Sequence, residues 1–306
     1  MPSKVSIIGA GHVGSSLAFA LVTRELCDRI VLVNRTRETA AGHAADLNHA
    51  AAFVPRAIHV DAGEVDDTSG SDVVVLTNSV PPPDGDLQDR MELLRGNVEL
   101  YRQWVPGLAE ANPSAVFVVV TNPVDPLTQI TWRLSGLPAR QVIGTGTIID
   151  SLRYRSYLSD TLGIHADDIR AYILGEHGDA QFPLLSMSTT GGETLDGDRR
   201  AEALFEKTRG AGLEVYRLKG YTDFAIAMAT TTIIESVIRD SRHTLPVSTL
   251  VDDFHGVGEV FLSLPAVIGA GGVCRLLHPR MSDGEVERWR AAAAKVKEAL
   301  AGVEVD

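Results

Sequence analysis

The chain has 306 residues, of which 44% are hydrophobic, and this length suits about two domains with a large buried core. Its 28 glycines and 14 prolines are too few for a fibrous or disordered protein. The 40 acidic residues outnumber the 28 basic ones, and the net charge of −12 repels nucleic acid and anionic membranes. We therefore expect a globular chain with no nucleic acid partner.

The two cysteines and the apolar segments indicate the compartment. Cys27 and Cys274 both lie in apolar stretches without a CxxC pair, so we interpret them as buried thiols in a reducing environment. No uninterrupted apolar run reaches the roughly 18 residues of a membrane span. The apolar start resembles a signal peptide, but its spaced glycines fit a strand, a turn and a helix better. We expect a cytoplasmic protein with no membrane partner.

In the first half of the chain, predicted strands alternate with predicted helices. Strands are expected at 4–9, 29–33, 57–62, 72–77 and 115–121, and helices at 12–23, 37–51 and 89–110. Near-continuous apolar strands separated by helices are typical of a parallel sheet that is covered on both faces. The predicted fold class is α/β, with an N-terminal open, doubly wound parallel sheet of the Rossmann type.

The pattern changes near Gly144, where the strict alternation stops. Helices are expected at 149–162, 198–217 and 221–239, and antiparallel strands at 170–174, 244–251 and 260–268. Ser282 and Glu285 form a capping-box pattern at the start of the last helix. We predict a dinucleotide-binding domain at residues 1–144 and a substrate-binding α+β domain at residues 145–306.

A GxGxxG motif joins the first predicted strand to the first predicted helix. Gly9 permits a tight turn, Gly11 lets the backbone approach a pyrophosphate, and Gly14 allows close helix packing. The helix N-terminus adds free N–H groups and positive potential. In this context the motif predicts dinucleotide binding.

The residues after the second strand bear on the choice of cofactor. NAD-binding domains commonly carry Asp or Glu there, whereas this chain reads Asn34-Arg35-Thr36-Arg37. An asparagine does not repel a 2′-phosphate, and Arg35 and Arg37 can neutralise it. The pattern favours NADP(H) and leaves NAD(H) open, because both arginines would also suit the surface of a first helical turn.

Two further segments carry residues for acid–base chemistry. In Gly175-Glu176-His177-Gly178-Asp179, a histidine lies between glycines directly after a predicted strand, where the backbone can approach a ligand. Asp150 and Arg153 share one face of a predicted helix and offer a carboxylate for an imidazole and a guanidinium for an anion. Taken singly, Asp150 would equally suit a helix-dipole partner and Arg153 a surface charge.

The chain resembles the lactate and malate dehydrogenases, the 2-hydroxy acid dehydrogenases with L stereochemistry. The resemblance runs nearly end to end and is carried by GAGHVGSS at 9–16, TNPVDPLT at 121–128, SGLP at 135–138, GTGTIIDSLRYR at 144–155, GEHGD at 175–179 and KGYT at 219–222. It implies hydride transfer between a nicotinamide and a small 2-keto or 2-hydroxy acid. It also implies a homodimer or a homotetramer.

The resemblance assigns catalytic roles to four positions. His177 would donate a proton to the substrate carbonyl, with Asp150 as its charge partner. Arg153 would bind the substrate carboxylate, and Arg90 would close over the site and polarise the carbonyl.

The resemblance also implies contacts around these four residues. Asn122 would fix the carbonyl and the nicotinamide, and Thr222 would face the substrate with Ile226 behind it. The implied cofactor-binding set is Gly9, Gly11, His12, Val13, Gly14, Asn34, Arg35, Arg37, Thr77, Asn78, Asn97, Thr121 and Asn122, and no metal is implied.

The segment before Arg90 departs from the family pattern. It contains three prolines and is about two residues longer than usual. The position that reads the substrate side chain falls on Asp84 when counted back from Arg90, and near Pro82 when counted from the strand. Neither is the arginine that pairs a second carboxylate, which disfavours malate. The acidic segment favours a substrate with a polar or cationic tail, unless its carboxylates face water.

Two alternative functions remain open at this point. A 2-imino acid reductase would use the same arginine, histidine and cofactor on a C=N bond, and an amine product would reveal it. A dinucleotide-binding protein without catalysis would retain the glycines, but it would have no reason to keep His177, Asp150 and Arg153 together. The apolar helix near residues 224–238 would suit either a subunit interface or the core.

Overall fold

The computed structural model describes residues 3–81 and 90–303. Runs of three to five residues form the parallel strands of the first half, and all except the strand at 59–63 are rich in valine or isoleucine. These are β1 (Lys4–Ile8), β2 (Arg29–Val33), β3 (His59–Gly63), β4 (Val73–Leu76), β5 (Val116–Val119) and β6 (Val142–Gly144). Their order is β3-β2-β1-β4-β5-β6, all parallel. The predicted doubly wound sheet is confirmed, and its order reverses between β1 and β4, where such sheets bind ligands.

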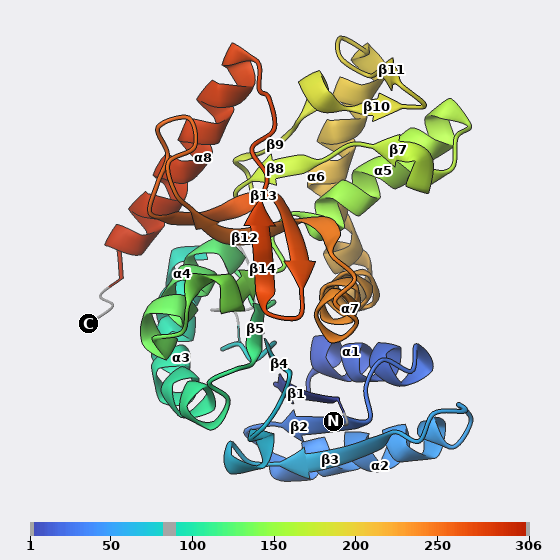
Figure 1. Ribbon diagram of the computed structural model, residues 1–306, viewed down its shortest axis with the longest axis vertical. Helices are drawn as coiled ribbons and strands as arrows, with labels where there is room; N and C mark the ends of the chain where they lie inside the picture. The colour runs from blue at the N-terminus through green and yellow to red at the C-terminus, as the bar shows by residue number, and fades with distance from the viewer. Residues whose placement is uncertain (1–2, 82–89, 304–306) are drawn as a thin grey trace.

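The same sheet continues into the second half with antiparallel strands (Figure 1). These are β8 (Ile173–Gly175), β9 (Gln181–Pro183), β12 (His243–Val251), β13 (Val260–Gly269) and β14 (Gly272–Leu276). β12 pairs with β6 on one side and with β13 on the other. A separate small sheet holds β7 (Ile169–Arg170), β10 (Thr189–Thr190) and β11 (Glu193–Thr194).

The single strand expected at 170–174 is wrong, because this segment contributes to both sheets. Ile169 and Arg170 pair with β10, whereas Gly175 pairs with β13. Arg170 is exposed, and the buried apolar residues of the segment divide between two cores: Ile173 packs in the core between the helices at 148–162 and 199–219, and Leu174 packs in the core of the large sheet. The sequence pattern therefore predicted one strand where the chain forms two short strands, β7 in the small sheet and β8 in the large sheet.

Helices cover both faces of the large sheet (Figure 1). They are α1 (His12–Thr23), α2 (Arg37–Ala51), α3 (Arg90–Ala111), α4 (Val124–Ser135), α5 (Ile148–Leu162), α6 (Arg199–Lys219), α7 (Phe224–Ile238) and α8 (Asp283–Ala301). α1, α2 and α7 bury side chains such as Leu17 and Ile233 in one core. α3, α4 and α8 bury side chains such as Tyr101 and Trp289 in the core on the opposite face. A third core lies between α5 and α6.

Short 3₁₀ helices complete the described chain at Asp66–Thr68, Ala139–Gln141, Ala166–Asp168 and Leu185–Met187. The predicted capping box is confirmed, since Ser282 and Glu285 each bond the other's backbone N–H at the start of α8. Cys27 is buried as expected, but the burial expected for Cys274 is wrong. Cys274 lies on β14, which pairs with β13 alone, at a register irregularity between the pairs Val267–Arg275 and Ile268–Val273, where it has no register partner. No described helix is long and apolar enough to cross a membrane.

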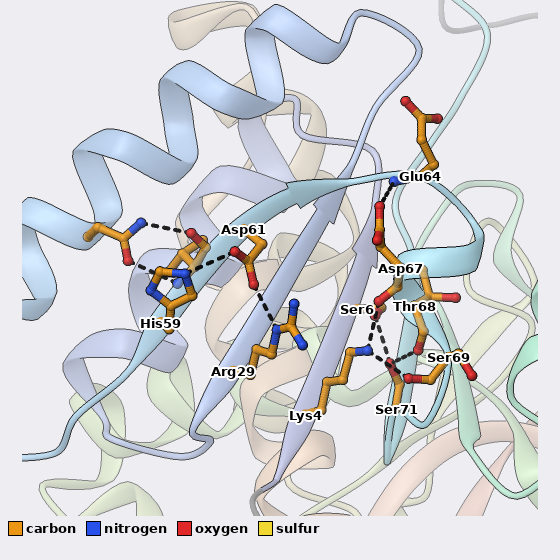
Figure 2. Close-up of polar contacts among 12 residues, drawn as sticks. Lys4, Ser6, Arg29, His59, Asp61, Glu64, Asp67, Thr68, Ser69 and Ser71 are labelled. Carbon is orange, nitrogen blue, oxygen red and sulfur yellow. Dashed lines mark hydrogen bonds and ion pairs between the residues drawn. The ribbon is translucent and has the colours of Figure 1, made fainter.

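Polar contacts join the strands of the parallel sheet near the amino ends of β1 and β2 (Figure 2). Arg29 Nε donates to Asp61 Oδ2 at 2.7 Å, which links β2 to β3. Lys4 Nζ donates to the carbonyl oxygens of Asp67 and Ser69, each at 2.7 Å. These contacts lie at the end of the sheet opposite the glycine loop, so the loops that follow the strands remain free for ligand binding.

Candidate active site

The three motif glycines have different structural roles. Gly9 has a φ of +108°, and a Cβ there would lie 2.7 Å from the backbone nitrogen of Asn78. A Cβ on Gly14 would collide with the carbonyl oxygen of Gly9. A Cβ on Gly11, the N-cap of α1, would meet nothing within 4 Å. Gly9 and Gly14 therefore serve internal packing, and Gly11 leaves open space at a helix N-terminus, as a bound pyrophosphate requires.

Side chains of the neighbouring strand ends hold this loop. Thr77 Oγ1, after β4, donates to the carbonyl oxygen of Gly9 at 2.8 Å. Asn34 Oδ1, after β2, accepts from the backbone N–H of Ala10 at 3.2 Å, and Asn34 Nδ2 donates to the carbonyl oxygen of Thr36 at 3.1 Å. Thr77 and Asn34 thus support the shape of the glycine loop.

A second set of polar residues connects the loops after β4 and β5. Thr121 Oγ1 donates to the carbonyl oxygen of Asn78 at 2.9 Å. The buried Asn97 accepts from the N–H of Val80 at 2.8 Å and donates to the carbonyl oxygen of Asn122 at 3.0 Å. Within the described residues, neither polar atom of the buried Asn78 amide has a partner. A buried amide left open beside the glycine loop fits a site that a polar cofactor completes.

Arg35 and Arg37 follow Asn34 and lie on the surface. Both are exposed, and Arg37 Nη1 is 3.9 Å from Glu64 Oε1, with both side chains more than 60% exposed. Among the described residues, Arg35 makes no hydrogen bond or ion pair in the structure. Val13, on the first turn of α1, packs against the core instead.

The structure brings His177, Asp150 and Arg153 together. His177 Nδ1 lies 2.6 Å from Asp150 Oδ2, and Arg153 Nη1 lies 3.7 Å from Asp150 Oδ1. The Asp150 side chain is 4% exposed, whereas those of His177 and Arg153 are 23% and 20% exposed. Because Nδ1 is bonded to Asp150, Nε2 is the nitrogen left to exchange a proton with a ligand.

Local structure fixes the histidine loop. Gly175 ends β8 with a φ of +93°, and a Cβ there would lie 2.9 Å from the carbonyl oxygen of Ala180. Glu176 Oε2 accepts from the N–H of Ala180 at 2.9 Å. The N–H of His177 donates to Asp125 Oδ2, from the first turn of α4, at 2.7 Å. The loop is therefore held on both sides of the imidazole.

The pair is electrostatically tuned for proton transfer. Burial opposes the charged forms of both partners, but the His177 charge and hydrogen bond outweigh it at Asp150 and hold the pKa of that carboxyl below its usual range. At His177, burial is outweighed by Asp150, with smaller contributions from Asp125 and Glu176, so the pKa of the imidazole is raised. A histidine of this kind retains its proton to higher pH than a free one.

The loop between α6 and α7 contacts α1, the helix that begins at the glycine loop. The rings of His12 and Tyr221 stack with centroids 3.7 Å apart and planes 5° from parallel. Ser16 Oγ donates to Asp223 Oδ2 at 2.9 Å. These two contacts place Thr222 next to the beginning of α1. Thr222, predicted to face the substrate, and His12, predicted to bind the cofactor, thus come from neighbouring segments.

Two predicted site residues cannot be placed in full. Asp84 lies outside the described residues. Arg90 is the first residue of α3, and its side chain also lies outside them. In the part of the chain that the structure describes, no group of His, Cys, Asp and Glu could hold a metal ion.

Sequence reasoning assigned no role to three contacting residues. Asp125 binds the His177 backbone, and Tyr221 stacks on His12. Gly212 lies against the Arg153 guanidinium, whose Nη1 would be in ordinary contact with a Cβ at that position, at 3.5 Å. Asp125 and Tyr221 lie inside the TNPVDPLT and KGYT motifs, which was the available signal. For Gly212 the sequence carries no signal.

A glycine loop at the reversal point of a doubly wound sheet, close to a histidine–carboxylate pair, defines a dinucleotide-dependent enzyme. Residues 3–144 match the family model described as lactate/malate dehydrogenase, NAD binding domain, and residues 147–305 match its alpha/beta C-terminal domain. The chain is 40% identical to L-lactate dehydrogenase A of Hordeum vulgare, over 95% of this chain and 85% of the relative. It is 36% identical to L-lactate dehydrogenase 1 of Clostridium acetobutylicum, over 97% of both.

A solved structure extends the similarity to three dimensions. The minor L-lactate dehydrogenase of Enterococcus mundtii, in a ligand-bound form, superposes with a TM-score of 0.94 at 30% identity, covering 100% of this chain and 99% of that one. The chain belongs to the lactate/malate dehydrogenase family. It is accordingly an oxidoreductase that acts on the CH–OH group of 2-hydroxy acids with a nicotinamide dinucleotide.

Proposed function

We propose that this protein interconverts an L-2-hydroxy acid and its 2-keto acid, with His177 as the general acid and base. One observation carries the proposal. The partly exposed His177 is bonded through Nδ1 to the buried Asp150, and Arg153 lies beside the same carboxylate. Asp150 therefore stabilises the imidazolium while Nε2 and the guanidinium remain for the substrate.

Arg153, His177 and Asp150 have different roles in the reduction of the carbonyl group. Arg153 pairs with the carboxylate of the keto acid and so brings its carbonyl to His177. The bound nicotinamide supplies the hydride. His177 gives its Nε2 proton to the carbonyl oxygen and becomes neutral, and it takes the proton back in the reverse direction. Asp150 orients the ring in both directions.

The remaining predicted roles belong to the same proposal. Asn122 and Thr222 contact the substrate, and Arg90, at the start of α3, polarises the carbonyl. The cofactor is held by the backbone at Gly9, Gly11 and Gly14, with Asn78 as a polar partner. The open space at Gly11 and the unpartnered amide of Asn78 support this assignment.

Within the nicotinamide cofactors, we propose a preference for NADP(H). The segment after β2 begins with Asn34 in place of an acid, and the Asn34 side chain is bonded within the loops around Gly11. Arg35 and Arg37 are exposed nearby and can bind a 2′-phosphate without losing a strong partner. Glu64, 3.9 Å from Arg37, is the group that competes with such a phosphate.

For the substrate tail, we propose a neutral polar or cationic group in place of a second carboxylate. This proposal rests on the acidic sequence that includes Asp84, where no arginine is available for a dicarboxylate. We further propose a homo-oligomer. Exposed apolar side chains occur on α1 (Phe19), α6 (Leu213 and Leu218) and α7 (Phe224), and α1 packs against α7. Exposed apolar surface of this kind commonly marks subunit contacts.

The test is a set of initial rates with NADPH and with NADH, across 2-keto acids with neutral, anionic and cationic tails. Each reaction is run with and without ammonium, and the H177A variant is the matched control. Turnover of a keto acid that is lost in H177A supports the proposal. Turnover that needs ammonium and yields an amine would indicate imine reduction instead, and cofactor binding without turnover would contradict catalysis.

A further inference from the structure

A second buried carboxyl lies against the histidine loop and is not used in the reaction above. Asp125 is 1% exposed in the first turn of α4, and its Oδ2 accepts the backbone N–H of His177 at 2.7 Å. This bond connects residues 52 positions apart and joins the helix after β5 to the loop after β8. Through it, the strand end that carries Asn122 is linked to the acid–base residue.

A backbone N–H needs only a neutral acceptor, so a carboxyl at this position is more than the bond requires. The other oxygen, Asp125 Oδ1, is buried and has no hydrogen-bond partner among the described residues. Burying a carboxylate without full pairing is expensive, and an amide or a carbonyl would satisfy the same N–H with less desolvation. Retaining the acid suggests that its charge acts on something nearby.

The charged groups around His177 identify what that charge acts on. Asp150, from α5, contacts the ring and is itself contacted by Arg153. Glu176 precedes His177 in the loop, and Asp125, from α4, binds the His177 backbone N–H. Lys295, from α8, contacts Glu176 at 3.3 Å. The nearest cations are therefore engaged with Asp150 and Glu176, which leaves Asp125 as the carboxyl whose field on His177 no described cation offsets directly.

We propose that Asp125 is a positioning residue whose two oxygens serve His177 in different ways: Oδ2 fixes the backbone of the loop, and the ionised carboxyl favours the imidazolium. The inference rests on the proposed function, because it assigns a partner to the same histidine. Burial raises the pKa of Asp125 to about 7, against a smaller lowering effect of the Ser248 hydroxyl. Asp125 is thus neutral on the acid side of that value and supports the charge of His177 only above it.

The test compares D125N, which keeps an acceptor for the His177 N–H but has no charge, with D125A, which has neither. The control is D179N, which removes an exposed carboxylate from the same loop, where Asp179 is 76% exposed and solvent screens its charge. Keto acid reduction is measured between about pH 5 and pH 8, the range in which histidine titrates. In parallel, the His177 ring is titrated by NMR in each free protein, which needs no activity.

We expect D125N to match the wild type at acid pH, where Asp125 is already neutral, and to lose about tenfold in kcat/KM at the alkaline end. Its His177 titration moves to lower pH, and D125A loses activity at every pH because the loop is released. An unchanged pH profile and ring titration in D125N would overturn the inference. If D125N does not fold, S248A should shift both curves in the same direction, and no shift there overturns it equally. A wild type without keto acid turnover would instead refute the proposed function and leave the NMR test standing.

Discussion

Replacing Asp150 with asparagine isolates the charge of the catalytic pair. Asparagine keeps the size of the side chain and an oxygen that can accept a hydrogen bond from His177 Nδ1. In the wild type this nitrogen lies 2.6 Å from Asp150 Oδ2. What disappears is the negative charge beside the imidazolium. Because Asp150 is buried, with a side chain only 4% exposed, solvent does little to replace that charge.

The size of the effect follows from the geometry. Two unit charges centred about 4 Å apart, in a protein with an effective dielectric constant of about 20, interact by about 4 kcal/mol. This energy corresponds to about a thousandfold in rate. Arg153 faces the same carboxylate at 3.7 Å and loses its own partner in the variant, so substrate binding also changes. We expect kcat/KM for keto acid reduction to fall about a thousandfold, with the cofactor Kd unchanged.

The assay is a steady-state rate measurement on D150N beside D160N, which removes an exposed carboxylate from the same helix. Thermal unfolding of both variants controls for folding. A loss below about tenfold in a folded D150N would refute the reasoning, since the charge would then contribute no more than an ordinary hydrogen bond.

The other predictions concern the cofactor loop, the substrate anchor and pH. G14A should unfold more easily, by about 1–3 kcal/mol, because its methyl group meets the Gly9 carbonyl. G11A should keep its Tm and bind cofactor more weakly, since its methyl group enters open space; equal Tm losses would contradict this difference. R153A should raise KM for the keto acid by about a hundredfold with the cofactor Kd intact, and an unchanged KM would remove Arg153 from the substrate site. Because the pKa of His177 is raised, keto acid reduction should stay fast above the ordinary histidine pKa and fall only at higher pH, while hydroxy acid oxidation rises. Rate profiles that run parallel in the two directions would disagree with that expectation.

The parallel sheet and the glycine loop were predictable because their determinants are local. Apart from β3, each strand of the first half is a short run rich in valine or isoleucine. Gly9 has a positive φ, and Gly14 is required by its contact with the Gly9 carbonyl within the same turn. The proximity of Asp150, Arg153 and His177 was expected from the sequence, since Asp150 and Arg153 share a helix face and His177 follows a strand. In these cases the spacing of residues along the chain determines how close their side chains lie in the fold.

The sequence could not indicate features that depend on distant segments. α4 was missed because its residues 124–131 are all buried, so no polar face marks a helical period, and Pro126 interrupts the pattern. The contact of Asp125 with His177 spans 52 residues, so the motif that contains Asp125 does not show which residue it binds. The exposure of Cys274 depends on β14 pairing on one side only, which a reading of apolar runs does not show.

The pairing of β6 with β12 has a consequence for how the two predicted halves behave. Gly144 and Ser248 are register partners, and a Cβ on Gly144 would lie 2.8 Å from that of Ser248, so the strands meet without a gap. Separate expression of residues 1–144 would leave one side of β6 without its hydrogen-bonding neighbour, and such edges recruit other strands. The first half produced alone should therefore self-associate, and co-expression with residues 145–306 should restore a dispersed complex by supplying the missing strand.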